Sequence, residues 1–158
     1  MESNKVIFTG QAWVVEGAVS SEAIIASLTQ EAERATHNLL LTTGVIGEGR
    51  AAAHAAMALQ HSGISGIIAP AFAWPFFRIC LNIGLPPLTV WEAEEIRRGD
   101  RLRVDLQTQV VKNLSSGTRY PIRDLSELYV TILASGGITG YIRLLRGEQA
   151  AIPLKGND

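Results

Sequence analysis

Hydrophobic positions along the chain fall into two kinds of segment, which alternate as in an α/β protein. Short apolar runs rich in leucine, isoleucine and valine predict buried strands, and longer stretches with apolar residues three or four positions apart predict helices. The expected strands are residues 5–10 and 12–15 (joined through Gly10), 38–42, 66–69 and 88–90, with an alternating stretch at 101–111 that turns near Gln107 and Thr108. The expected helices are residues 20–35, 50–62, 71–84, 92–99, 124–137 and 138–145.

Local signals support several of these boundaries. Ser20 or Ser21 is an expected N-cap, Pro75 fits the first turn of its helix, and Asp124 is an expected cap for the helix that follows it. The strand, glycine loop, helix and strand over 38–69 form a βαβ unit, whose crossover should be right-handed. We expect one α/β domain, with a frayed tail over 147–158.

Composition narrows the classes of function. Only 18% of the 158 residues are charged, below the roughly 25% typical of soluble domains, which predicts that a partner or a second copy covers some apolar surface. A net charge of -1 argues against nucleic acid or an anionic membrane as a partner. The single cysteine, Cys80, excludes an internal disulfide and a cluster held by several thiolates of this chain. No secretory signal or membrane-length apolar run is visible, so we expect a cytoplasmic protein.

The glycine loop is the first candidate site. Gly44, Gly47 and Gly49 precede a helix whose first amides and dipole favour a carboxylate, phosphate or oxyanion, and Arg50 adds a positive charge. The order of the glycines differs from the dinucleotide fingerprint. The alternative is that the glycines only allow a tight turn.

The histidines and the aromatic residues are further candidates for a functional site. His54 lies four residues after Arg50 and is either structural or catalytic, whereas His37 and His61 lack partners at metal-ligand spacing, so no metal site is expected. The aromatic residues near the start of the next helix either belong to the core or line a pocket: Trp74, Phe76 and Phe77.

Four segments resemble one known family. "GIIAPAFAWPFFRICLNIGLPPLTV" (66–90) is similar to V-I-A-x-S-F-A-x-I-F-x-x-N-x-x-N-x-G-L-x-P of the small subunit of 3-isopropylmalate dehydratase (isopropylmalate isomerase) and of the swivelling domain of aconitase. "GEGRAAAHAAMAL" lies where the family carries G-[CE]-G-S-S-R-E-H-A-x-x-A-L. "GQAWVVEGAVSSEAII" and "YPIRDLSELYVTILASGGITGYI" resemble the family's opening and closing segments, so the similarity runs over about residues 10–146.

The resemblance implies a three-layer β/β/α swivelling domain. It also implies a large-subunit partner that holds a [4Fe–4S] cluster, and joint dehydration and rehydration of a hydroxy-di- or tricarboxylic acid. In the family, a serine of the G-S-S-R segment removes the proton, while backbone amides and the arginine hold the substrate carboxylate.

Departures from the family motifs bear directly on activity. The two serines fall on Arg50 and Ala51, and the arginine and glutamate fall on Ala52 and Ala53. The motif residues that remain are Gly47, Glu48, Gly49 and His54. Neither alanine nor a permanently protonated arginine can act as the base. The family's D-T-D motif is replaced by Ser20, Ser21 and Glu22, and residues 25–39 are shorter than the family's recognition-loop segment.

Three functions follow from these observations. The favoured one is a recruited, cluster-independent relative that acts as an isomerase, cyclase or dehydratase on a small carbonyl or carboxylic metabolite. Its candidate site has Arg50 with Glu48 or His54 as catalytic residues, and a substrate contacted by Gly47, Gly49, Ala51, Trp74, Phe76 and Phe77. The second is the small subunit of an aconitase-type hydro-lyase complex with an Fe–S large subunit. The third is a non-catalytic pseudoenzyme or scaffold. No cofactor is expected in this chain, and its partner is a large subunit or further copies of itself.

Overall fold

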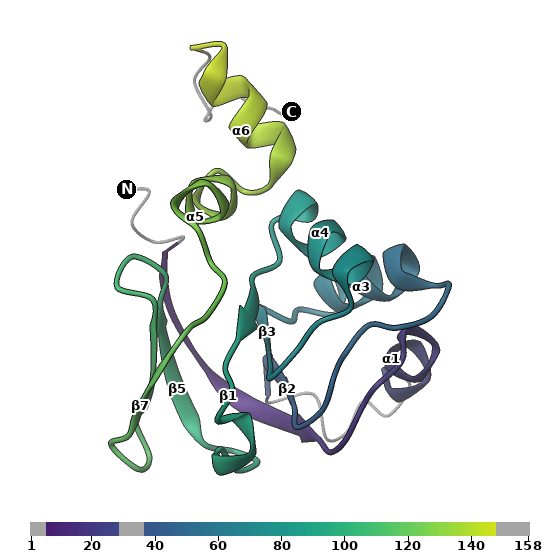
Figure 1. The fold of residues 1–158 in the computed structure, drawn as a ribbon, viewed down its shortest axis with the longest axis vertical. Helices are drawn as coiled ribbons and strands as arrows, with labels where there is room; N and C mark the ends of the chain where they lie inside the picture. Colours follow the sequence, from purple (N-terminus) through teal and green to yellow (C-terminus); the bar gives the residue numbers. More distant parts are fainter. Residues whose placement is uncertain (1–5, 29–36, 148–158) are drawn as a thin grey trace.

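One mixed sheet organises the protein. The computed structural model describes residues 6–28 and 37–147, and in them seven strands are ordered β4-β3-β2-β1-β5-β6-β7 (Figure 1). The parallel half consists of β1 (Ile7–Val15), β2 (Leu39–Thr42), β3 (Gly66–Ala69) and β4 (Pro87–Thr89). The antiparallel half adds β5 (Arg101–Asp105), β6 (Val110–Asn113) and β7 (Arg119–Pro121).

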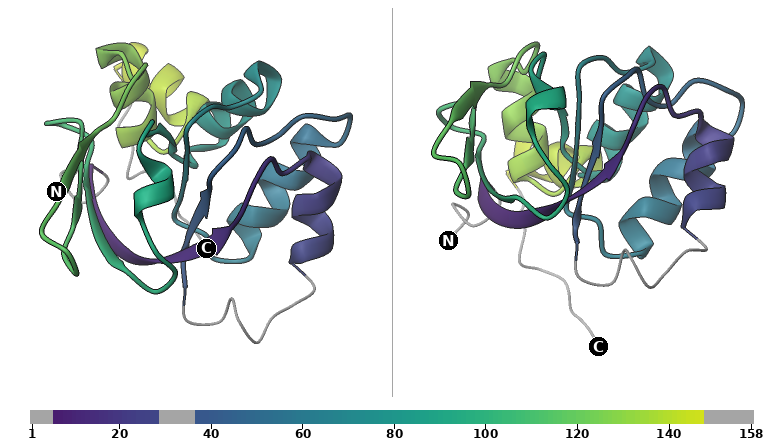
Figure 2. Two further views of the ribbon diagram at one scale, coloured as in Figure 1. Left: turned by 60° about the horizontal axis from the view of Figure 1, so that its bottom comes forward. Right: turned by 90° about the horizontal axis from the view of Figure 1, so that it is seen from below.

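β1 belongs to both halves of the sheet. Its first part pairs antiparallel with β5 and its last part, from Ala12, pairs parallel with β2. Two strands joined through Gly10 were expected here, but the structure has one continuous strand of nine residues. A side chain at Gly10 would overlap Asn38, whose Oδ1 accepts a hydrogen bond from the Gln11 amide at 3.1 Å. Glycine therefore lets the chain before β2 approach β1 where the sheet curls (Figure 2).

Strand residues of alternating direction separate two hydrophobic cores. Leu39 and Leu41 point into a core between the parallel and antiparallel halves, whereas Leu40 points into a second core beneath helices. Three helices supply the outer side of the second core: α1 (Ser21–Ser27), α3 (Ala52–His61) and α4 (Trp74–Ile83). This confirms the expected three-layer β/β/α arrangement.

The ends of these helices match the sequence signals in part. Ser20 caps α1 by accepting a hydrogen bond from the Ala23 amide at 3.1 Å. The expected continuation of this helix over 29–35 lies outside the described residues. α3 begins at Ala52 rather than at residue 50. α4 carries Pro75 in its first turn as expected, and it ends at Gly84 in the left-handed conformation with φ of 83°.

The last third of the described chain departs most from expectation. The expected helix over 92–99 is only a 3-10 turn, η2 (Ala93–Glu95), and β7 was not expected. Asp124 does not cap α5 (Glu127–Ala134); instead Ser126 accepts a hydrogen bond from the Tyr129 amide at 3.2 Å. α6 (Ile138–Leu145) has its expected bounds.

Candidate ligand-binding site

The loops that follow three parallel strands lie side by side at the carboxyl edge of the sheet. Val19, Ile46 and Phe72, which follow β1, β2 and β3, form successive parallel bridges. The Gly47 amide donates to the Val19 carbonyl, and the Ile46 amide donates to the Ala71 carbonyl, at 2.9 and 3.1 Å. Ligands of α/β proteins commonly bind at this edge. The predicted glycine turn and the predicted aromatic segment therefore adjoin each other.

The glycine turn is tied to the start of α1. The buried Ser21 hydroxyl donates to the Gly47 carbonyl at 2.9 Å, and the Ser21 amide donates to the Glu48 carbonyl at 2.7 Å. The backbone N–H of Arg50 donates to Glu22 Oε2 at 3.3 Å. One amide of the expected anion-holding turn thus already faces a carboxylate of the same chain.

The turn has no room for a side chain at Gly47 or Gly49. Gly47 and Gly49 have φ of 102° and 115°, which L side chains rarely adopt. A Cβ at Gly47 would overlap the Phe76 ring, and one at Gly49 would overlap the Glu22 carboxylate. The turn therefore has the structural role that the sequence left open, whether or not it also binds an anion.

The structure separates the predicted site residues into two groups. Glu48 and Arg50 lie exposed on the glycine turn, and His54 is exposed on α3. Ala51 is the N-cap position of α3, without a side-chain hydrogen bond. Phe76 is fully buried beneath Gly47 and is not among the residues that line the cavity described next. Only Trp74 and Phe77 line the cavity described next.

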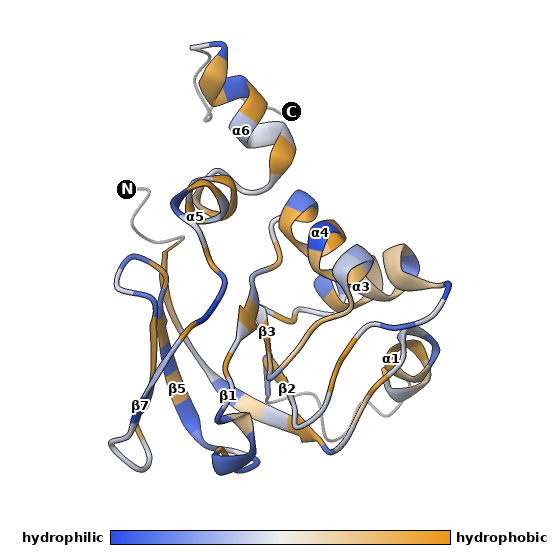
Figure 3. Cartoon of the chain, viewed as in Figure 1, coloured by the Kyte–Doolittle hydropathy of each residue, from blue (hydrophilic) through white to orange (hydrophobic). Residues whose placement is uncertain are grey.

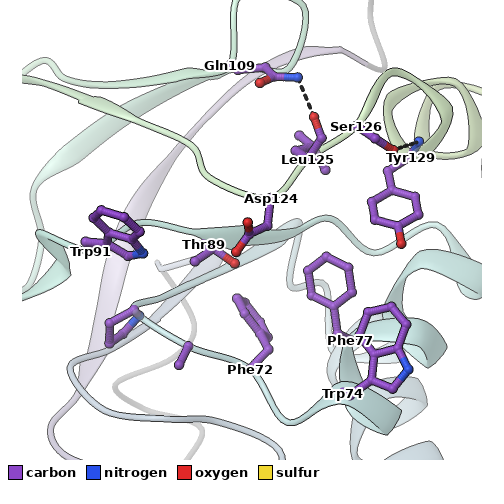
Figure 4. Close-up of a pocket in the computed structure, with 12 residues that line it drawn as sticks. Phe72, Trp74, Phe77, Thr89, Trp91, Gln109, Asp124, Leu125, Ser126 and Tyr129 are labelled. Carbon is purple, nitrogen blue, oxygen red and sulfur yellow. Dashed lines mark hydrogen bonds between the residues drawn. The ribbon is translucent and has the colours of Figure 1, made fainter.

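A cavity of about 670 Å³ opens beside this turn, between the ends of β3 and β4 and the starts of α4 and α5 (Figure 4). This volume is within the range of roughly 300–1,000 Å³ typical of small-molecule sites. Its lining residues are Pro70, Ala71, Phe72, Trp74, Phe77, Thr89, Trp91, Gln109, Asp124, Leu125, Ser126 and Tyr129.

Phe77 is the centre of the aromatic wall. Its ring lies stacked 5.6 Å from Trp74, edge-on 5.6 Å from Phe72 and tilted 5.8 Å from Tyr129. Such pairs hold one another in fixed orientations. Trp74 nevertheless stays 54% exposed at the rim, so the wall offers an apolar surface to a ligand.

Two residues on the opposite wall have unusual backbones. Gln109 and Asp124 both have φ of 60°, and they are the non-glycine residues with positive φ in the described chain. Strained conformations of this kind gather at functional sites. The Gln109 side chain donates to the Leu125 carbonyl, which joins the turn before β6 to the segment before α5 within this wall (Figure 4). Asp124 brings the one carboxylate among the lining residues.

Trp91 forms the remaining part of the rim. It is 60% exposed, and the Arg123 guanidinium carbon lies 4.1 Å from its ring centroid. The Arg123 amide donates to the Thr89 carbonyl at 2.8 Å, which joins the segment after β7 to β4.

The resemblance assigns the [4Fe–4S] cluster to a large subunit, and the described residues of this chain do not form a ligand set for it. Cys80 is fully buried in α4, and burial raises the pKa of its thiol well above the ordinary value, so no thiolate is available as a ligand. Within residues 6–28 and 37–147, no three His, Cys, Asp or Glu side chains are grouped to hold a metal ion. In the same ranges no single helix is long and apolar enough to cross a membrane. α5 and α6 reach that length only when taken together, and a bend of 98° separates them.

A solved structure gives the class of this fold. The 3-isopropylmalate dehydratase of Methanocaldococcus jannaschii superposes with a TM-score of 0.78 over 89% of this chain and 95% of its own, at 22% identity. The architecture is therefore that of a swivelling domain of the aconitase type.

Sequence comparison gives the family. The 3-isopropylmalate dehydratase small subunit of Pyrobaculum islandicum is 34% identical over 115 residues, which are 72% of this chain and 71% of the relative. That of Clostridioides difficile is 36% identical over 111 residues, 70% of this chain and 68% of the relative. The chain belongs to the 3-isopropylmalate dehydratase small subunit family.

The match to some relatives is shorter. Small subunit 1 of Thermotoga maritima is 37% identical over 97 residues, and this match spans only 58% of that protein. No family model matches the sequence.

Proposed function

We propose that this chain is the small subunit of a two-chain hydro-lyase in the cytoplasm, paired with a large subunit that carries the Fe–S cluster. In this proposal the chain binds part of the substrate in the aromatic cavity. A group other than the family's serine acts as the base that removes the proton. Family membership supports the pairing, because the relatives are named as small subunits.

The observation that carries the binding role is the position of the cavity. It lies at the carboxyl edge of the parallel strands, where loop 70–74 runs beside the glycine turn. Its aromatic wall fits an apolar substituent better than a carboxylate, since Asp124 would repel an anion. The acid groups of the substrate would then lie outside the cavity, toward the partner.

The test is reconstitution with the large subunit from the same organism. We expect hydration of an alkyl-substituted unsaturated diacid only when both chains are present. Trp74→Ala should raise KM at least tenfold, and Met57→Ala, an exposed change on α3, should leave KM unchanged. Full activity of the large subunit alone, or equal KM values for the two variants, would contradict the proposal.

Two observations favour a second candidate function. The serine that acts as the family's base is absent, and the cavity is lined by residues of this one chain. This candidate is the recruited relative that works without a cluster, as an isomerase, cyclase or dehydratase of a larger, less acidic metabolite. Arg50 would stabilise negative charge, and Glu48 or His54 would transfer a proton. If a substrate is turned over by the chain alone, the Arg50→Ala/Glu48→Ala double variant should abolish turnover, and unchanged turnover would reject this assignment.

A further inference from the structure

Three cations lie in register across the antiparallel half of the sheet. Arg103 of β5 is directly opposite Lys112 of β6, and Lys112 is directly opposite Arg119 of β7. On the other side, Arg103 is opposite Thr9 of β1. We call Arg103, Lys112 and Arg119 the cation row.

The cation row lies on the face of the sheet that turns away from the core. The residues that alternate with it along the strands are buried, among them Leu102, Val104, Val111 and Tyr120. Arg103 and Arg119 are exposed and Lys112 is half-buried. Figure 3 shows hydrophilic segments along β5.

Folding alone does not account for this arrangement. Like charges directly opposite on neighbouring strands destabilise a sheet, and none of the three forms an ion pair within residues 6–28 and 37–147. Asp105 lies in the same shallow hollow, but its carboxylate accepts hydrogen bonds from the amides of Gln107 and Thr108, at 2.9 and 3.2 Å.

The position of β7 explains only one of the three cations. Charged residues on an edge strand prevent it from pairing with another chain, and β7 is an edge strand. That accounts for Arg119. β5 and β6 are interior strands, so Arg103 and Lys112 need another reason.

The spacing of the cation row indicates its occupant. Directly opposite Cβ atoms on neighbouring strands are about 4.5–5.5 Å apart, so the row presents positive charge at a repeat close to 5 Å. Residues i and i+4 of a helix have Cβ atoms about 5–6 Å apart. A helix with glutamates at i, i+4 and i+8 therefore matches the row when its axis lies across the strands.

We propose that the cation row is a docking surface for an acidic helix of a partner protein. The proposal does not rest on the hydro-lyase function. The chain's net charge of -1 gives no general attraction for anions, so recognition comes from the local row. Contacts between exposed charges are individually weak, and binding should depend strongly on salt.

The test uses the full chain and two synthetic helical peptides of identical composition. One carries three glutamates at i, i+4 and i+8, and the other distributes them around the helix. We expect the first peptide to bind at least tenfold more tightly at low salt, and to lose this advantage at high salt. Lys112→Glu/Arg119→Glu should weaken its binding at least tenfold.

Arg143→Glu/Arg146→Glu on and after α6 is the matched control, since it makes the same change in net charge away from the row. This variant should bind the first peptide like the natural chain. The cation-row variant should be at least as heat-stable as the natural chain, because it removes like-charge contacts. Three results would overturn the proposal. The two peptides could bind equally, or both variants could lose the same affinity for the first peptide. Pyrophosphate could also displace the first peptide at an equal concentration.

Discussion

The carboxylate of Glu22 accepts a hydrogen bond from the backbone N–H of Arg50 at 3.3 Å. The first residues of α1 therefore bind the turn that precedes α3. The sequence predicts that this turn receives a substrate anion, but in the structure the Glu22 side chain occupies part of that position. Glu22 and a substrate carboxylate would compete for the same amide.

Removal of the Glu22 carboxylate should have two effects. Glu22→Ala loses a charge–dipole contact at a helix start, so we expect a fall of about 0.5–1 kcal/mol in the free energy of unfolding. Malonate should then raise the melting temperature of the variant more than that of the natural chain. Glu16→Ala removes another exposed glutamate and should show neither effect. Equal malonate responses in all three proteins would show that the turn does not bind carboxylates.

Gly47 provides a test of the contact between the turn and α4. Gly47→Ala should destabilise the protein by about 3 kcal/mol or more, because the new methyl overlaps the Phe76 ring and the backbone has positive φ. Gly63→Ala is the matched control, since Gly63 has φ of 90° and open space around it. We expect the control to lose only about 1 kcal/mol, from the backbone strain alone. Chemical denaturation measures both, and similar losses would contradict the described packing.

Asp124 should determine which ligands the aromatic cavity accepts. Asp124→Asn keeps a residue that tolerates φ of 60° and removes the negative charge. We expect this variant to bind aromatic carboxylates at least threefold more tightly, as followed by the fluorescence of Trp74 and Trp91 at the rim. Affinity for the matching uncharged amides should stay unchanged. If the affinity for acids and for amides rose by the same factor, Asp124 would act through its shape rather than its charge.

Cys80 should be unreactive and should reduce stability at high pH. Burial raises the pKa of its thiol above the ordinary value of 9.0, so the folded protein keeps the proton where the unfolded chain loses it. Its contribution is complete below pH 9 and declines as the pH rises further. Iodoacetamide at pH 8 should label Cys80 only after denaturant is added. Cys80→Ala should flatten the alkaline part of the stability curve, and rapid labelling of the native protein would contradict this burial.

Local patterns predicted the part of the chain that positions the site. The strands at 38–42 and 66–69 and the helix with Pro75 depend on apolar runs and on the fixed φ of proline, which act over a few residues. The glycines of the turn are also a local signal, because they favour a tight turn between a strand and a helix. The cavity was only partly foreseen, through Trp74 and Phe77.

Long-range pairing accounts for what sequence reasoning missed. Trp91, Gln109 and Asp124 come from three separate segments, and β7 and the bridge between Thr89 and Arg123 bring the last of them to the cavity. The notable backbone of Asp124 carries no sequence signal, because aspartate before a helix also fits an N-cap. Ser126 takes that role, which leaves Asp124 to face the cavity.

The central claim is that this chain works as one subunit of a cluster-bearing hydro-lyase, and native mass spectrometry with iron analysis tests it most directly. The tagged chain, purified without oxygen from its own organism, should carry a second subunit of the dehydratase large-subunit type and about four iron atoms per large subunit. A homo-oligomer or monomer without iron would contradict the claim.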